Sequence, residues 1–262
     1  MKGVHRVFDP GGSVQRNKGL CALAVMTKAP RAGQVKTRLT PPLTPKEAAE
    51  LNTCFLRDTT AAISFAATKG SARGIAVYTP VGEEETYAGI LPVEFELVPQ
   101  RGETFGERLI FALEDLFALG FESVCLIDSD SPTVPHRAFT EAVTILAEST
   151  DTVVVGPTDD GGYYLIGLKR LQRELFQDIA WSTERVLQQT IERARQMNLT
   201  VHLLRTWYDV DDRATLRRLC DDFFGADGSV AAGYPAPATR GYLNGLLQRE
   251  GRDRIWPNEA ES

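Results

Sequence analysis

A short apolar run that ends in two aspartates is the feature that most restricts how this chain can fold. Residues 124–127 are all apolar and lead directly into Asp128 and Asp130, after which Pro132 ends the run. Such a run is typical of a buried strand in a parallel sheet. In open α/β sheets, ligands bind beyond the carboxyl ends of the strands. The two acids are therefore expected at a ligand site.

The spacing of these two acids favours a metal ion. In an extended segment, residues i and i+2 point to the same side, so Asp128 and Asp130 can share one cation. Carboxylate oxygens suit Mg²⁺ or Mn²⁺, and these ions in turn bind phosphate oxygens. The alternative interpretation is a strand end that carries two solvated acids.

A basic segment follows the first predicted strand, residues 20–26. Residues 27–39 contain four cations and no acid, and Gly33 and Pro30 argue against a regular element there. The cations are Lys28, Arg31, Lys36 and Arg38. In a chain of net charge −6, this concentration of positive charge predicts a phosphate site. A solvated basic loop is the alternative, and the segment is not a Walker A motif because the Gly-Lys-Ser/Thr order is missing.

Strand and helix signals alternate along the chain. Strands are predicted at 20–26, 74–78, 93–98, 124–127, 152–155 and 201–204. Helices are predicted at 45–69, 135–148, 182–197 and 213–224, and a further helix begins within 100–108 and ends at about 119. The predicted N-caps are Thr44, Ser182 and Asp212. This alternation predicts a single-domain α/β fold with a mainly parallel sheet and helices on both faces.

The ends of the chain and its composition indicate the domain boundaries, the compartment and the classes of partner. Residues 1–19 lack the apolar core of a signal peptide and are predicted to be a disordered leader. Residues 20–224 form the predicted domain, and 225–262 form a partly irregular C-terminal extension.

The four widely spaced cysteines favour a reducing cytoplasm. No stretch approaches the roughly 20 apolar residues of a membrane span, and the acidic charge predicts no nucleic-acid partner. The oligomeric state stays open.

Two further segments place acids after predicted strands. Asp160 is followed by Gly161 and Gly162, which suggests backbone close to a ligand, although a hairpin turn explains the glycines equally well. Asp209 and Asp211 repeat the i, i+2 spacing after a predicted strand and in front of a helix, which fits either a further metal-binding carboxylate or favourable helix-end charge. Asp211 is the favoured ligand of the two.

These segments, in this order, resemble the nucleotide-diphospho-sugar transferase (GT-A) superfamily. More narrowly, the chain resembles a small bacterial family of glycosyltransferase-like proteins, designated DUF2064, that accompanies radical-SAM and arsenosugar genes in some operons. The matching segments are Lys28-Ala29-Pro30 with Gly33 and 36–39, Gln100 with Gly102 and 106–108, 128–132, Gly156-Pro157 with 160–167, and 209–211. Together they cover about residues 20–220.

The resemblance implies a role for each matching residue. Nucleotide-binding residues would be Lys28, Gly33, Lys36, Arg38, Arg108 and Asp128. Metal ligands for Mg²⁺ or Mn²⁺ would be Asp128, Asp130, Asp209 and Asp211. The acceptor side would include Gly161, Gly162 and Tyr163. Catalytic roles fall to Asp160, the best candidate for a base, and to Lys36.

The expected function is metal-dependent transfer of a sugar from a nucleotide-sugar to a small acceptor. An alternative is nucleotidyl transfer from a nucleoside triphosphate to a phosphorylated small molecule, because residues 36–39 and 209–211 also resemble nucleotidyltransferases that guanylylate phospholactate or phosphoglycerate. Two minor alternatives are a haloacid-dehalogenase-type phosphatase, suggested by residues 128–131, and a nucleotide-binding module without catalysis. The segment between 131 and 159 is too short for the phosphatase fold.

Overall fold

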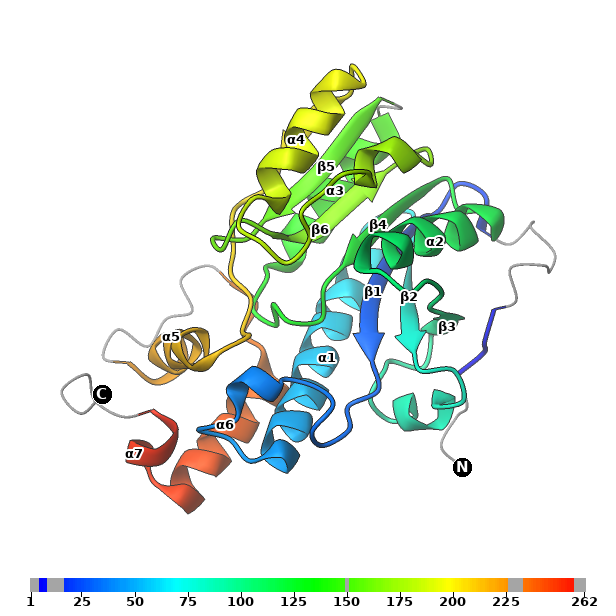
Figure 1. Cartoon of the computed structure of the whole chain (residues 1–262). Helices are drawn as coiled ribbons and strands as arrows, with labels where there is room; N and C mark the ends of the chain where they lie inside the picture. Colours follow the sequence, from blue (N-terminus) through cyan, green and yellow to red (C-terminus); the bar gives the residue numbers. More distant parts are fainter. Residues whose placement is uncertain (1–4, 9–16, 149–150, 226–232, 257–262) are drawn as a thin grey trace.

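The strands form one mixed sheet in the part of the chain that the computed structural model describes, residues 5–8, 17–148, 151–225 and 233–256. The strands are β1 (Cys21–Lys28), β2 (Ala72–Thr79), β3 (Glu96–Pro99), β4 (Ser123–Ile127), β5 (Thr152–Pro157), β6 (Tyr163–Leu168) and β7 (Thr200–Leu203). Their order is β3-β2-β1-β4-β6-β5-β7 (Figure 1). Only β6 among them runs antiparallel to its neighbours. The predicted α/β class and mainly parallel sheet are confirmed.

Helices cover both faces of this sheet. They are α1 (Pro45–Ala67), α2 (Phe105–Ala118), α3 (His136–Glu148), α4 (Val186–Gln196), α5 (Arg213–Phe224), α6 (Pro237–Glu250) and α7 (Arg252–Ile255). Alternate residues of β1 point to opposite faces: Leu23 and Val25 join a core with α1, α3, α5 and α6. Ala22 and Ala24 join a second core with α2 and α4. The period-2 geometry of a strand thus divides the apolar side chains between two layers.

The sheet order creates one topological switch point. From β1 the chain moves outward through β2 and β3, and then returns to the other side of β1 as β4. β1 and β4 are parallel, so Lys28 and Asp128, which stand at or just after their carboxyl ends, lie at the same edge. Ligands of open α/β sheets bind at such a crevice.

Several helix starts agree with the sequence. Thr44 accepts a hydrogen bond from Glu47 N while the Glu47 carboxylate accepts one from Thr44 N, which forms a complete capping box at α1. Asp212 caps α5 through Thr215 N at 2.9 Å. α2 begins at Phe105, with Thr104 as its N-cap. Each signal lies within a few residues of the element that it defines.

Two predicted elements differ from the structure. The predicted strand 93–98 is shortened to β3 because residues 92–95 form a turn, in which Phe95 N donates to Pro92 O. Ser182 does not cap a helix: its φ of +62° is incompatible with the extended backbone of an N-cap. α4 therefore begins only at Val186.

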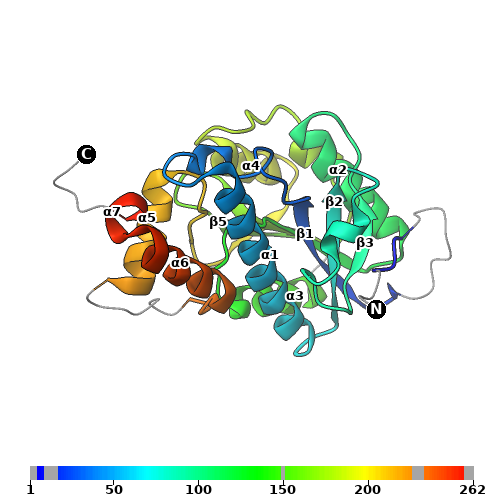
Figure 2. The ribbon, with the colours of Figure 1, turned by 90° about the horizontal axis from the view of Figure 1, so that it is seen from below.

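The two predicted tails contain ordered segments. Residues 1–4 and 9–16 of the expected leader lie outside the described residues, but Val7 pairs with Leu97 of β3 and Phe8 is buried, so these residues extend the sheet edge. In the expected C-terminal extension, α6 packs on α1 (Figure 2). None of the described helices is both long and apolar enough to cross a bilayer.

Asp58 of α1 holds the start of α6. Its carboxylate accepts hydrogen bonds from Ala238 N at 3.1 Å and Thr239 N at 2.7 Å. α6 has no side-chain cap of its own, so Asp58 satisfies backbone donors that would otherwise be buried without a partner. Burial raises the pKa of Asp58, and the hydrogen bonds from Thr239 and Ala238 offset this only in part.

We expect Asp58→Ala to lower the free energy of unfolding by about 2 kcal/mol, because two amides of α6 lose their acceptor. Asp58→Asn keeps one acceptor oxygen and avoids the buried charge, so its loss should be smaller. Urea unfolding measures both. Gly241→Ala in the same helix is a suitable control, since its added Cβ meets no atom within 4 Å. Equal stability of Asp58→Ala and the parent would contradict the assignment.

Candidate functional site

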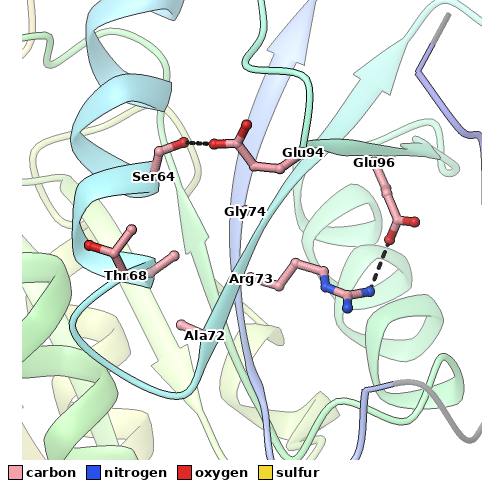
Figure 3. A pocket seen from close by; sticks show the side chains of 8 residues that line it. Ser64, Thr68, Ala72, Arg73, Gly74, Glu94 and Glu96 are labelled. Carbon is pink, nitrogen blue, oxygen red and sulfur yellow. Dashed lines mark hydrogen bonds and ion pairs between the residues drawn. The ribbon is translucent and has the colours of Figure 1, made fainter.

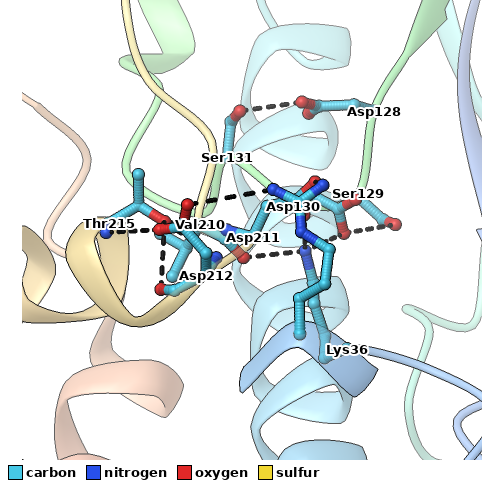
Figure 4. Close-up of polar contacts among 10 residues, drawn as sticks. Lys36, Asp128, Ser129, Asp130, Ser131, Val210, Asp211, Asp212 and Thr215 are labelled. Atoms are coloured by element: carbon cyan, nitrogen blue, oxygen red, sulfur yellow. Dashed lines mark hydrogen bonds and ion pairs between the residues drawn. The ribbon is translucent and has the colours of Figure 1, made fainter. Parts of the chain in front are cut away.

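Lys36 lies at the centre of the polar cluster beyond the carboxyl edge of the sheet. Its side chain is 5% exposed, and its Nζ lies 2.8 Å from Oδ1 of Asp130 and 2.8 Å from Oδ1 of Asp211. Nζ also donates to Val210 O at 2.9 Å. Figure 4 shows the lysine pointing between the two carboxylates. Burial alone would lower the pKa of Lys36, but the charges of Asp130 and Asp211 reverse this and raise it.

Backbone contacts bring these three residues together. Lys36 adopts a left-handed conformation with φ 49° at the entry to a short 3-10 helix, Thr37–Leu39, which directs its side chain inward. Val210 N donates to Asp130 O at 2.9 Å, so the segment after β7 is hydrogen-bonded to the segment after β4. Trp207 Nε1 adds a buried hydrogen bond to Thr133 Oγ1 at 2.9 Å.

The remaining acids of the cluster repel one another. Burial raises the pKa of Asp128 well above its ordinary value, and the charge of Asp130 adds to this, although Ser131 Oγ donates to Asp128 at 2.8 Å. Burial also raises the pKa of Asp209 to about 6, with further contributions from Asp211 and Asp160. Such crowding of carboxylates is a common property of functional sites.

Two pockets meet at this cluster. The first, of about 250 Å³, is basic on one side. Its lining residues are Lys28, Gln34, Val35, Lys36, Thr37, Arg38, Asn52, Ser129, Asp130 and Asp211. The second, of about 460 Å³, is acidic and partly aromatic. Its lining residues are Arg38, Phe105, Asp128, Asp130, Thr158, Asp160, Gly162, Tyr163, Trp181, Ser182, Thr183, Glu184, Val186, Asp209 and Asp211. Arg38, Asp130 and Asp211 line both, so the two pockets form one continuous site.

Most of the residues expected from the sequence lie in these pockets, but three do not. Gly33 (φ +75°) has open space around it and lines neither pocket. Arg108 donates to the carbonyls of Gly102 and Glu103 in its own loop. Gly161 (φ +89°) is pressed against the backbone of Glu184, where an added Cβ would lie 2.1 Å from a carbonyl oxygen. Packing within the protein therefore accounts for Gly161.

Several pocket residues were not predicted. In the basic pocket these are Gln34, Val35, Thr37, Asn52 and Ser129; in the acidic pocket they are Phe105, Thr158, Trp181, Ser182, Thr183, Glu184 and Val186. An isolated tryptophan followed by polar residues, as at Trp181, is a signal that could have indicated a binding loop. Asn52 gives no such signal because it lies within a long amphipathic helix.

Among the described residues, no group of three or more His, Cys, Asp or Glu side chains is arranged to hold a metal ion. The four aspartates expected as ligands are thus not gathered into one preformed shell. Asp130 and Asp211 do converge on a single cation, the ammonium of Lys36. Mg²⁺ commonly uses only one or two carboxylates together with substrate phosphates, so this pair has the chemistry that a phosphate-bound ion requires.

A third pocket, of about 620 Å³, lies at the other end of the sheet, between α1 and the start of β2 (Figure 3). Its polar groups already satisfy one another: Ser64 donates to Glu94 at 2.6 Å and Arg73 to Glu96 at 3.2 Å. It lies at the amino end of β2 and away from the acidic cluster, so we place the functional site at the switch point.

Comparisons with known proteins agree with this fold. Residues 62–183 match the family described as "Uncharacterized protein conserved in bacteria (DUF2064)". A proposed nucleotide-diphospho-sugar transferase from Desulfovibrio desulfuricans G20 is 29% identical, with a TM-score of 0.74, over 89% of this chain and 98% of its own. A nucleotidyl transferase from Methanothermobacter is 15% identical, with a TM-score of 0.51, over 78% and 98%. No curated protein matches this chain. The expected resemblance to this family and superfamily is confirmed.

We expect Lys36→Ala to destabilise the protein by about 1–3 kcal/mol, because Asp130 and Asp211, which are 34% and 35% exposed, lose the cation that both contact. Mn²⁺ should then raise the melting temperature of this variant more than that of the parent. Thermal unfolding with and without Mn²⁺ measures both effects. Lys28→Ala is the matched control, since Lys28 is exposed and donates to Gln34 O, with no ion pair in the described part of the chain. If the two variants are equally stable, Lys36 does not hold the cluster together.

We expect Asp209→Asn to stabilise the protein at pH 7 but not at pH 4. Its folded pKa of about 6 exceeds the ordinary value of 3.8. The protonated carboxyl therefore favours folding below about pH 4, and this contribution is lost as the pH rises through 6. Urea unfolding from pH 4 to pH 8 tests this. A difference between variant and parent that does not change with pH would show that Asp209 ionises normally.

Proposed function

We propose that this chain is a transferase that moves a sugar from a nucleotide-sugar to a small acceptor without phosphate groups. The observation that carries this proposal is the charge of the acidic pocket: six of its described lining residues are acids, and Arg38 is their only cation. Carboxylates accept hydrogen bonds from hydroxyl groups and repel phosphates. The acceptor that suits this pocket is rich in hydroxyls.

The neighbouring basic pocket suits the diphosphate of the donor. Lys28, Lys36 and Arg38 line it, together with the amide side chains of Gln34 and Asn52. Arg38 is 68% exposed and lies 3.8 Å from Asp211 and from Asp212, so it is available to a ligand. Lysine and arginine form charge-assisted hydrogen bonds with phosphate oxygens.

Asp130 and Asp211 are the residues that would hold a divalent cation between the two pockets. Their Oδ1 atoms contact Lys36, so the ion would bind beside the lysine and not in its place, and each residue lines both pockets. When bound, Mg²⁺ or Mn²⁺ would neutralise the charge that develops on the departing diphosphate. Lys36 supplies positive charge at the same place from the chain itself.

In this proposal, Asp160 accepts the proton of the attacking hydroxyl. One of its oxygens, Oδ1, accepts hydrogen bonds from Thr158 Oγ1 at 2.6 Å and Gly162 N at 3.0 Å. These bonds fix the carboxylate beside the acidic pocket and leave Oδ2 for a substrate. In the transfer, the bond between the sugar and the diphosphate breaks, the acceptor oxygen bonds to the sugar, and Asp160 takes the proton.

The alternative is nucleotidyl transfer to a phosphorylated molecule with release of pyrophosphate. The likeness to the Methanothermobacter fold and the two cations at Lys36 and Arg38 support it. The acidic pocket argues against it, since two like charges 4 Å apart repel by about 4 kcal/mol at an effective dielectric constant of 20. A phosphorylated acceptor would meet such repulsion at Asp160 and Glu184, whereas Lys36 balances part of the charge of Asp130 and Asp211.

We expect product analysis with Mn²⁺ to find nucleoside diphosphate from nucleotide-sugars and no pyrophosphate from nucleoside triphosphates. Asp160→Asn should slow transfer by roughly 10²-fold or more, as loss of a general base does. Asp159→Asn is the matched control, because Asp159 pairs with Arg218 and does not line the pocket. Pyrophosphate release that depends on a phosphorylated acceptor would establish the alternative instead.

A further inference from the structure

The acidic pocket has an aromatic wall made of Trp181, which also packs against the second core, and Phe105. Phe105, the first residue of α2, is 50% exposed. Its ring meets that of Trp181 edge to face, with centroids 5.2 Å apart, and both residues line the pocket. An exposed phenylalanine costs solvation free energy, so an aromatic pair at the mouth of a polar pocket points to a ligand with an apolar face.

The loop that carries Trp181 is held rigidly. Trp181 N donates to Ile179 O at 2.9 Å, and Thr183 Oγ1 donates to Ala180 O at 2.7 Å. The side chain of Gln189, from α4, accepts from Ala180 N at 2.8 Å. Ser182 adopts a left-handed conformation, with φ +62°, that is uncommon outside glycine. Strained backbone of this kind persists where the surrounding contacts fix it.

The position of the indole also depends on Gly106. An ideal Cβ on Gly106 would lie 2.7 Å from Nε1 of Trp181. Alanine is normally the better residue in a helix, by about 1 kcal/mol. The glycine in α2 thus makes space for the indole against the first turn of the helix.

Carboxylates stand in the same pocket as the aromatic pair. Glu184 lines it, and within the described part of the chain its carboxylate has no hydrogen-bond or ion-pair partner. Its backbone is fixed against Gly161, and Leu187 N donates to Gly161 O at 2.8 Å. The pocket therefore offers an apolar aromatic surface together with hydrogen-bond acceptors on fixed backbone.

We propose that Trp181 and Phe105 bind a ring-shaped polyol without phosphate groups, which stacks one apolar face on the indole while its hydroxyls donate to Glu184 and Asp160. This identification of the acceptor class rests on the proposed function. A ring presents a flat apolar face and outward hydroxyls at once, whereas an open-chain polyol of the same composition does not. Trp181 is thus a specificity-determining residue.

The test is calorimetric titration, in the presence of Mn²⁺, with methyl α-glucoside, methyl α-mannoside, methyl α-galactoside and myo-inositol. Sorbitol, glucose 6-phosphate and choline are the comparison probes for an open chain, a phosphate and a cation. We expect at least one ring polyol to bind better than all three comparison probes. Trp181→Ala should weaken that binding roughly tenfold, and Trp181→Phe should restore part of it.

Gly106→Ala provides a second variant that leaves Trp181 itself in place. It should weaken ring binding by displacing the indole, whereas Gly241→Ala, a glycine-to-alanine change in open space in α6, should have no effect. The inference is overturned if no ring binds, if sorbitol, glucose 6-phosphate or choline binds as well as the best ring, or if Trp181→Ala changes nothing. Nucleoside diphosphate release from nucleotide-sugars, measured separately, tests the proposed function. This release can occur without selective binding of rings, and rings can bind selectively without this release.

Discussion

The ammonium group of Lys36 joins three segments that lie far apart in the sequence. It contacts Asp130, which follows β4, and Asp211, which follows β7, from a loop that follows β1. The two carboxylates are about a third exposed and face the same ammonium group, so they would repel each other without it. Together with the backbone hydrogen bond from Val210 N to Asp130 O, this side chain holds both acids at the boundary between the basic and acidic pockets.

Local signals in the sequence were sufficient to predict most of the fold. Apolar runs located β1 and β4, and capping residues located α1 and α5, because each signal and its element occupy neighbouring positions. The prediction failed at Ser182 because it used only the local sequence. A serine before a predicted helix looks like a cap, but contacts with Gln189 and Thr183 impose a different backbone conformation there.

The candidate site could be predicted only in part. The types of its residues were visible, since acids and cations followed predicted strands, but their pairing was not. Lys36 and Asp211 are far apart in the chain, and no local pattern reports that the lysine, rather than a metal, occupies the position between the aspartates. The aromatic wall was missed because Phe105 and Trp181 come from different elements, and neither forms a motif alone.

In the proposed reaction, the arrangement of charge would also separate the two substrates. A nucleotide donor has its negative charge on the diphosphate, and a hydroxyl-rich acceptor has none, so one basic and one acidic pocket separate the two substrates by charge alone. Arg38, Asp130 and Asp211 line both pockets, so in the proposed reaction the bond that changes would lie beside them. A buried Lys36 holds these acids in place before either substrate arrives, which reduces the reorganisation needed when the substrates bind.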